Sequence, residues 1–227
     1  MIPAKQSAAF VAAMEDVITV YQRPEDPARP LVCMDETSKQ LVKETRAPIA
    51  AEPAGNGHAG HPERIDYEYE RNGVANVFML FEPLAGKRTV RITARRTKKD
   101  WAHLIKLLCD EVHPGAAKIT LVMDNLNTHA PASLYETFEP AEARRLLDRL
   151  EIHYTPKHGS WLNMAEIELA ILSKQCLDRR IPDRDTLRAE VAAWAQLRAK
   201  ESGRVHWRFT TKDARIKLAK LYPVISK

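Results

Sequence analysis

The sequence predicts an α/β protein built on a mixed five-stranded sheet with helices on both faces. Short apolar segments of strand length alternate with segments whose apolar residues recur at helical spacing. The early strands follow one another directly, which favours antiparallel pairing, whereas the later strands are separated by helices, which favours parallel crossovers. A sheet that combines both connections is mixed, and its helices cover both faces.

The N-terminal part is expected to contain one helix and the antiparallel strands. Helical spacing of apolar residues predicts a helix over residues 6–22, and a proline-rich lead-in ends it. Asn72-Gly73 is a strong turn dipeptide, so the segments on either side of it are predicted to form a hairpin. Residues 46–63, rich in Ala, Gly and Pro, are expected to form a mobile surface excursion. The strands are predicted at 31–35, 67–71, 74–82 and 87–93.

The C-terminal part alternates helices with strands. Strands are expected at 119–124 and 152–154, and helices at 98–112, 140–150, 161–178, 183–201 and 211–221. With the first strand central and strand 119–124 beside it, this order is the RNase H-like layout. Three parts are expected: an N-terminal helix and lead-in over 1–30, an α/β core over 31–180, and a helical basic extension of the core over 181–227.

Composition favours a soluble globular protein. Of the 227 residues, 29% are charged and 44% hydrophobic, and no apolar run approaches the roughly 18 residues of a membrane span. Acidic residues interrupt the hydrophobic N-terminal stretch, which argues against a signal peptide. Cys33, Cys109 and Cys176 are odd in number and far apart, so buried free thiols in a reducing cytoplasm are expected.

The net charge of +5 is concentrated near the C-terminus. From Arg204 onward the chain has seven basic residues and one acid, so this segment suits a polyanion such as nucleic acid. A solvated helix face with ordinary basic residues explains the same charge equally well. The candidate DNA-binding residues are Arg204, Arg208, Lys212, Arg215, Lys217 and Lys220.

Three acidic residues are candidates for a metal site. Asp35 and Asp124 each close a mostly apolar strand segment, and Glu166 stands one turn into a predicted helix. A carboxylate at such a strand end is normally protonated, paired or metal-bound. Three carboxylates suit two magnesium ions, which stabilise the attacking and leaving oxygens of a phosphodiester reaction. Ordinary strand-end and helix-start acids account for the same positions about as well.

Two neighbouring acids are poorer candidates on geometric grounds. Glu36 follows Asp35 directly, so on a strand it points to the opposite face of the sheet. Glu168 is two positions past Glu166, about 200° around a helix of 3.6 residues per turn. Asn163 shares the helix face of Glu166. We therefore expect Asp35 and Glu166 to belong to the site.

Around these acids the chain resembles the DDE transposases of the Tc/mariner superfamily, specifically its bacterial insertion-sequence branch. The resemblance lies in MDET at 34–37, MDNLNTH at 123–129 and HYTPKHGSWLNMAE at 153–166, and it continues to the C-terminus. It implies a catalytic core in which Asp35, Asp124 and Glu166 bind Mg²⁺, for which Mn²⁺ can substitute. The implied reaction is DNA cleavage and strand transfer at insertion-sequence ends.

The resemblance also suggests supporting residues and partners. Asn125 and His129 are expected to orient Asp124 or to contact the DNA backbone, and Asn163 is placed in the same supporting group. Lys157 and His158 precede the catalytic helix, where a cation and backbone groups suit a phosphate, although a simple loop is equally open. The implied partners are terminal inverted repeats and target DNA, bound by a homodimer in the bacterial cytoplasm at the nucleoid, without membrane association.

Two departures from the family pattern stand out. The 41 residues between Asp124 and Glu166 exceed the usual spacing, and only one predicted helix precedes Asp35, where a helix-turn-helix region is usual. The chain therefore resembles a catalytic domain alone. A non-catalytic DNA-binding transposase remnant and a generic RNase H-like nuclease or resolvase are the alternatives.

Overall fold

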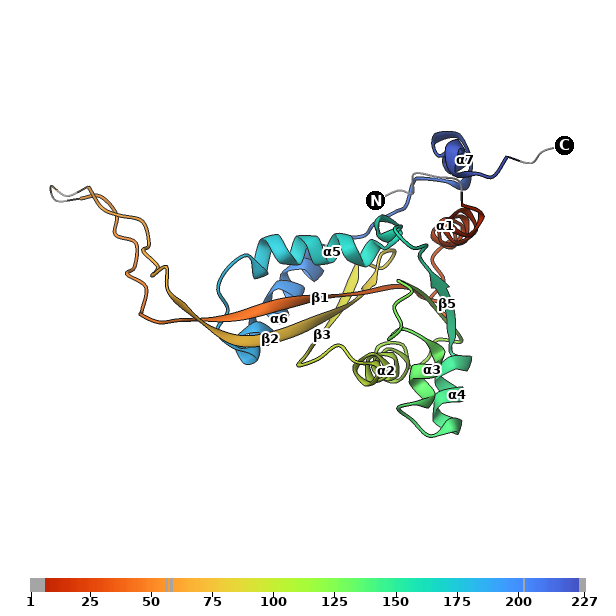
Figure 1. Cartoon of the computed structure of the whole chain (residues 1–227), viewed down its shortest axis with the longest axis horizontal. Helices are drawn as coiled ribbons and strands as arrows, with labels where there is room; N and C mark the ends of the chain where they lie inside the picture. The colour runs from red at the N-terminus through yellow and green to blue at the C-terminus, as the bar shows by residue number, and fades with distance from the viewer. Residues whose placement is uncertain (1–6, 56, 58, 202, 225–227) are drawn as a thin grey trace.

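Five strands form one mixed sheet in the order β3-β2-β1-β4-β5 (Figure 1). The computed structural model describes residues 7–55, 57, 59–201 and 203–224. β1 and β2, and β2 and β3, pair antiparallel, whereas β1 and β4, and β4 and β5, pair parallel. The predicted mixed five-stranded sheet with its RNase H-like order is confirmed. The strands are β1 Leu31–Glu44, β2 Tyr69–Glu82, β3 Lys87–Thr93, β4 Ile119–Met123 and β5 Leu150–Tyr154.

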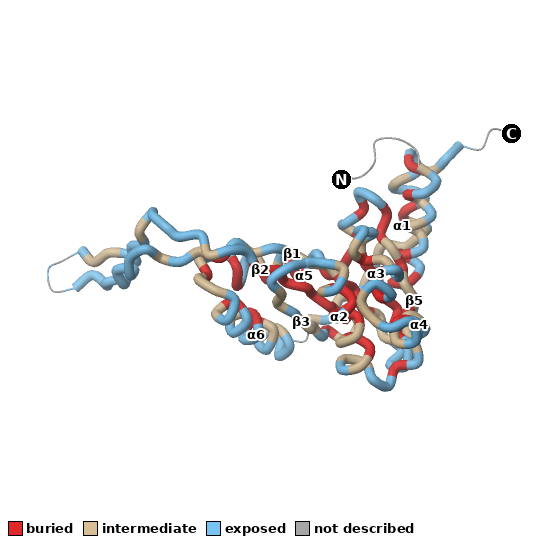
Figure 2. Tube along the Cα trace, turned by 60° about the horizontal axis from the view of Figure 1, so that its bottom comes forward, coloured by how far each residue is buried: buried red, intermediate tan, exposed pale blue. Residues whose placement is uncertain are grey.

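Helices cover both faces of this sheet because alternate strand residues point to opposite sides. Cys33 of β1 faces one apolar cluster and Met34 faces the other. Buried residues gather along the sheet and the helices on it, as Figure 2 shows. The first cluster includes residues of α1 Ala8–Tyr21, α5 Met164–Leu172, α6 Arg184–Lys200 and α7 Thr211–Lys217; the second includes residues of α2 Lys98–Leu107, α3 Pro131–Tyr135 and α4 Pro140–Asp148.

Several predicted helices are interrupted. The π-helical segments η1 Leu108–Val112 and η3 Ser173–Leu177 continue α2 and α5, so two predicted long helices change their hydrogen-bond pattern near their ends. The 3₁₀ segments η2 Ser160–Leu162 and η4 Ala219–Leu221 flank α5 and α7. α3 was not predicted, and residue 6 of the predicted first helix lies outside the described residues.

The predicted hairpin turn at Asn72-Gly73 is wrong, because both residues lie inside the single strand β2. β2 pairs with β1 along its length, and the register shifts once, where Leu41 stands opposite Asn72 and Gly73. Gly73 has a φ of +86°, and a Cβ there would meet no atom within 4 Å. The left-handed backbone therefore favours glycine at this position, and a β-bulge uses the same conformation as a hairpin turn.

The chain leaves the sheet between β1 and β2. β1 continues to Glu44, well past the predicted end at residue 35, and the described residues between 45 and 68 then form an excursion that projects from the sheet (Figures 1 and 2). Two antiparallel bridges, Ile49 to Arg64 and Glu52 to His61, draw its two sides together. Most of its described residues are exposed, which confirms the predicted surface excursion; its mobility stays a prediction.

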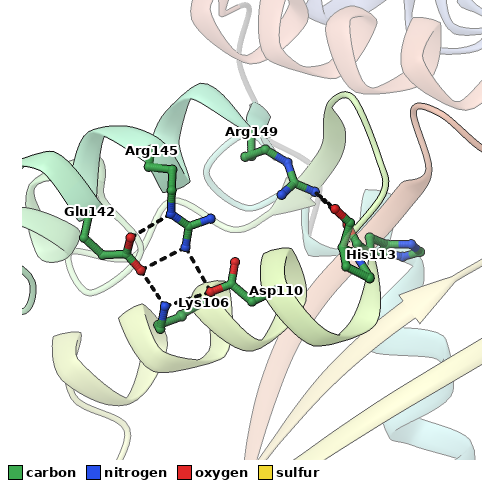
Figure 3. Close-up of polar contacts among 7 residues, drawn as sticks. Lys106, Asp110, His113, Glu142, Arg145 and Arg149 are labelled. Atoms are coloured by element: carbon green, nitrogen blue, oxygen red, sulfur yellow. Dashed lines mark hydrogen bonds and ion pairs between the residues drawn. The ribbon is translucent and has the colours of Figure 1, made fainter.

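A polar network on the surface joins α4 to α2 and η1 (Figure 3). Lys106 and Arg145 each contact Asp110 and Glu142 at N–O distances of 2.5 to 2.9 Å. Hydrogen bonds from Arg145 and Lys106 lower the pKa of Glu142 to about 2 and lower that of Asp110 as well. Because these side chains are partly exposed, each pair contributes less than about 1 kcal/mol. The carboxylates of this network are fully matched by cations, so the cluster is structural.

Two further expectations concern the environment of the chain. The three cysteines are buried free thiols, as predicted. Among the described residues, no helix combines the length and the apolar character needed to cross a membrane.

Candidate metal centre

The fold brings Asp35, Asp124 and Glu166 together from three different elements. Cys33 of β1 is level with Val122 of β4 in a parallel pair, so Asp35 and Asp124, each two residues further on, lie side by side at the edge where β4 ends. Asp35 has the same strand parity as Cys33, so it faces the side of the sheet that α5 covers. Glu166 stands in the first turn of α5.

The raised pKa of Asp35 indicates that the three carboxylates repel one another. Burial raises the pKa of Asp35 to about 7, and the negative charges of Asp124, Glu36 and Glu166 add to this effect. A hydrogen bond from the backbone N–H of Glu36, 2.8 Å from Asp35 Oδ1, opposes it only partly. Asp35 forms no ion pair with a Lys or Arg among the described residues. The site therefore concentrates negative charge that a cation is suited to neutralise.

The chemistry of the donors fits divalent magnesium. Carboxylate oxygens are the hard ligands that Mg²⁺ prefers, and the nearby cysteine Cys33 is buried against Tyr21 on the core side. Within the described residues, however, no three acidic, His or Cys side chains enclose a common point closely enough to hold an ion by themselves. Mg²⁺ usually keeps several waters and uses one or two protein carboxylates with substrate phosphate, so an open arrangement of this kind agrees with it.

Asn163 ties the helix that carries Glu166 to the strand that carries Asp35. Its side-chain Nδ2 donates to the backbone carbonyl of Met34 at 2.9 Å, and its Oδ1 accepts from the N–H of Ala165 at 3.1 Å. Asn163 is therefore both the N-cap of α5 and a direct link to β1, and only 1% of it is exposed. The start of α5 is thereby held against the backbone of Met34, the residue that precedes Asp35 in β1.

His129 contacts Asp124, as expected for a residue that orients it. Nδ1 of His129 lies 2.6 Å from Asp124 Oδ1, and Nε2 lies 3.2 Å from Glu36 Oε2. Burial alone would lower the pKa of His129, but the contacts with the carboxylates of Asp124 and Glu36 outweigh it and raise the pKa to about 9. The ring is therefore an imidazolium at neutral pH; Nδ1 donates to Asp124, whereas the contact of Nε2 with Glu36 is an ion pair without hydrogen-bond geometry. Asn125 is exposed, and its side chain forms no hydrogen bond with another described residue.

Glu36 and Glu168 both turn away from the carboxylate cluster. Glu36 lies on the opposite face of β1, where it contacts His129. Glu168 is buried on the core side of α5, and its carboxylate binds Arg88 and Arg198. Sequence reasoning separated these acids from Asp35 and Glu166 by strand and helix periodicity, but it gave no signal for their partners, which come from distant parts of the chain.

The turn before α5 is tighter than the sequence suggested. His158 has a φ of 66°, and a Cβ on Gly159 would come within 2.5 Å of Pro156 Cγ, so glycine is required there. Lys157 and His158 are exposed, but η2 separates them from α5, whose N-cap is Asn163. A phosphate at the turn would therefore not lie directly on the N-terminus of α5.

The basic C-terminal segment presents its charges to solvent. Val205, Trp207 and Phe209 pack against the core while the residues between them face outward. All six candidate DNA-binding residues are exposed: Arg204, Arg208, Lys212, Arg215, Lys217 and Lys220. Arg215 is held by Glu15 through two hydrogen bonds of 2.9 and 2.8 Å, so its charge is already paired.

Asp35→Asn is expected to stabilise the metal-free protein at pH 8. Because the folded-state pKa of about 7 exceeds the ordinary aspartate value, the wild type loses stability as pH rises from about 4 to about 7. The variant lacks this loss, so its free energy of unfolding should exceed that of the wild type by up to about 4 kcal/mol at pH 8 and by much less at pH 4. Urea unfolding in EDTA measures the free energies of unfolding of the variant and the wild type at each pH. Lower stability of the variant at pH 8 would contradict the prediction.

Comparison with known proteins adds a family and a fold. Residues 30–188 match the family model described as DDE superfamily endonuclease. The chain is similar to the Mos1 transposase paired-end complex with left transposon end (TM-score 0.53, 10% identity, 91% of this chain and 66% of that chain). It is also similar to the mariner Mos1 paired end complex with Mg (TM-score 0.55, 13% identity, 99% and 66%).

A third similar structure is the Mos1 mariner paired end complex with Mn (TM-score 0.53, 13% identity, 89% of this chain and 62% of that chain). The chain thus spans 62 to 66% of the length of these three chains. At such low identity the likeness shows the fold. No curated protein matches the chain.

Proposed function

This chain belongs to the DDE superfamily of endonucleases, and we propose that it is the catalytic domain of a Tc/mariner-type transposase from a bacterial insertion sequence. The proposed activity is metal-dependent cleavage of DNA at the ends of the element, followed by strand transfer into target DNA. The observation that carries the proposal is the meeting of Asp35, Asp124 and Glu166 at one edge of the sheet, with Asp35 partly buried, repelled by the other two and without a basic partner among the described residues.

In this proposal Asp35, Asp124 and Glu166 hold Mg²⁺ or Mn²⁺, with two ions in the complete site. The bound ions would activate the attacking oxygen and stabilise the leaving 3′ oxygen of the phosphodiester. The protein contributes fixed ligand positions. Asn163 holds the start of α5 against β1, and His129 holds one oxygen of Asp124.

DNA is the proposed partner, as inverted-repeat ends and as target, and the active assembly is proposed to be a homodimer on DNA. The similar structures are described as paired-end complexes, one of them with a left transposon end. The exposed basic side chains from Arg204 to Lys220 are proposed to contact phosphates, together with Asn125, Lys157 and His158 near the carboxylates. Such contacts make binding fall steeply with salt.

The proposed division of the chain keeps 31–180 as the catalytic core, preceded by the lead-in 1–30 and followed by the basic extension 181–227. α6 and residues 205–222 pack on the same apolar cluster as the sheet, which supports an extension that belongs to the core. A DNA-acting protein of this kind is proposed to work in the bacterial cytoplasm at the nucleoid.

Nicking of supercoiled plasmid tests the proposal. The purified chain is expected to nick plasmid in Mg²⁺ or Mn²⁺ but not in EDTA, and Asp124→Asn should remove the activity while Glu111→Gln, an exposed acid on η1, should retain it. Joining of a labelled DNA end to plasmid would then support strand transfer. DNA binding without nicking would favour a non-catalytic DNA-binding remnant. Cleavage without joining would favour a generic RNase H-like nuclease or resolvase.

A further inference from the structure

Glu36 is a buried carboxylate to which the proposed mechanism assigns no role. Its side chain is only 3% exposed and lies on the opposite face of β1 from Asp35. Arg96, 59% exposed, stands 3.9 Å away, which is too distant and too solvated to match a buried charge. The close partner of Glu36 is His129 Nε2, at 3.2 Å.

Four contacts fix the position of His129. Its ring stacks on Trp101 with a centroid distance of 6.0 Å, and its backbone carbonyl accepts a hydrogen bond of 2.9 Å from the Tyr154 hydroxyl. With Asp124 at Nδ1 and Glu36 at Nε2, a carboxylate faces each ring nitrogen. A 180° flip of the ring would bring Cδ2 and Cε1 to the positions of Nδ1 and Nε2 and so remove both contacts, and these contacts therefore select one orientation of the ring.

The contact leaves Asp124 with one oxygen engaged and one available. His129 Nδ1 bonds Oδ1, and 32% of the Asp124 side chain is exposed to solvent. An oxygen fixed by a neighbour turns the other oxygen in a defined direction, as hydrogen-bond partners of metal ligands do elsewhere. The direction in which Asp124 presents its available oxygen thus depends on the position of the His129 ring.

We propose that Glu36 is a positioning residue, which sets the His129 ring so that Nδ1 donates to Asp124 and the remaining oxygen of Asp124 faces the metal site. The proposal rests on the proposed function, because it assigns Asp124 as a metal ligand. Glu36 acts only through His129 and does not itself touch the ion or the DNA.

A double-mutant cycle with Mn²⁺ binding as readout tests this proposal. The variants are Glu36→Ala, His129→Ala and the double variant, each titrated with Mn²⁺ alone and followed by electron paramagnetic resonance. Glu36→Ala should weaken Mn²⁺ binding about 10-fold or more. In the His129→Ala background the same change should have no further effect, because the residue through which Glu36 acts is gone.

Two more variants of Glu36 serve as controls. Glu36→Gln keeps an acceptor oxygen for Nε2 and should retain most of the affinity, whereas Glu36→Leu fills the space without an acceptor and should behave like Glu36→Ala. If Glu36→Ala does not fold, Glu36→Leu takes its place in the cycle. Three results would each overturn the proposal. The losses of Mn²⁺ affinity in Glu36→Ala and His129→Ala could multiply in the double variant, Glu36→Leu could bind Mn²⁺ with wild-type affinity, or the wild type could bind no Mn²⁺. Absence of nicking with these Mn²⁺ results intact would count against the proposed function alone.

Discussion

Glu166→Gln is expected to abolish metal-dependent DNA cleavage while leaving the fold intact. Glu166 is exposed in the first turn of α5, and its side chain forms no ion pair or hydrogen bond with the described residues. Glutamine has the same shape but lacks the charge that a divalent ion requires. Loss of several kcal/mol of charge stabilisation in the transition state corresponds to a rate decrease on the order of 1000-fold.

The measurement is the initial rate of plasmid nicking in Mg²⁺, together with a urea unfolding curve for each protein. Glu111→Gln is the matched control, because it removes the same charge from an exposed helical position away from the carboxylates. Nicking by Glu166→Gln at the rate of this control would remove Glu166 from the site.

Glu168→Gln, two residues along the same helix, is expected to affect stability rather than chemistry. The substitution should lower the free energy of unfolding by about 3 to 5 kcal/mol. Glu168 and Arg88 are each 1% exposed in their side chains, and they are joined by contacts of 2.5 and 2.9 Å. Arg198 adds a third contact at 3.2 Å. Removing the negative charge leaves the Arg88 guanidinium buried without its counter-ion, which costs more than the pair contributes.

Equilibrium unfolding in urea measures this loss, with Glu166→Gln as the internal reference. Both variants exchange one carboxylate for one amide on α5, yet only Glu168 has buried charged partners. A stability change of Glu168→Gln no larger than that of Glu166→Gln would mean that Arg88 is satisfied by other groups. Its backbone acceptors Gly86 and Gly203, at 2.8 and 3.2 Å, are the ones available.

Periodicity in the sequence was sufficient to predict much of this arrangement. Alternation along a strand separates Asp35 from Glu36, and the helical repeat separates Glu166 from Glu168; the structure has both separations. The sheet order also follows from pattern, because direct and helix-linked connections differ in pairing direction. These features depend on local spacing, which a sequence contains.

Features that depend on distant contacts were not predictable. Nothing in the sequence near Glu168 indicates Arg88, which comes from β3, or Arg198, which comes from α6. The Asn72-Gly73 dipeptide indicates a left-handed backbone but not whether a turn or a bulge will use it, since the pairing of β2 with the extended β1 decides. The position of Glu36 beside His129 likewise appears only when β1 and the segment after β4 meet.

The uncompensated charge around Asp35 has a consequence for the fate of gene copies of this protein. If the proposed function holds, replacement of Glu166, which forms no ion pair or hydrogen bond with the described residues, is expected to leave folding intact, and replacement of Asp35 is expected to favour it. A single-base change of a glutamate codon yields glutamine, so under the proposed function a copy that cannot cleave DNA but still folds and exposes the same basic segment would be one mutation away. Such copies would persist as well-folded competitors for DNA, and selection on folding alone would not remove them.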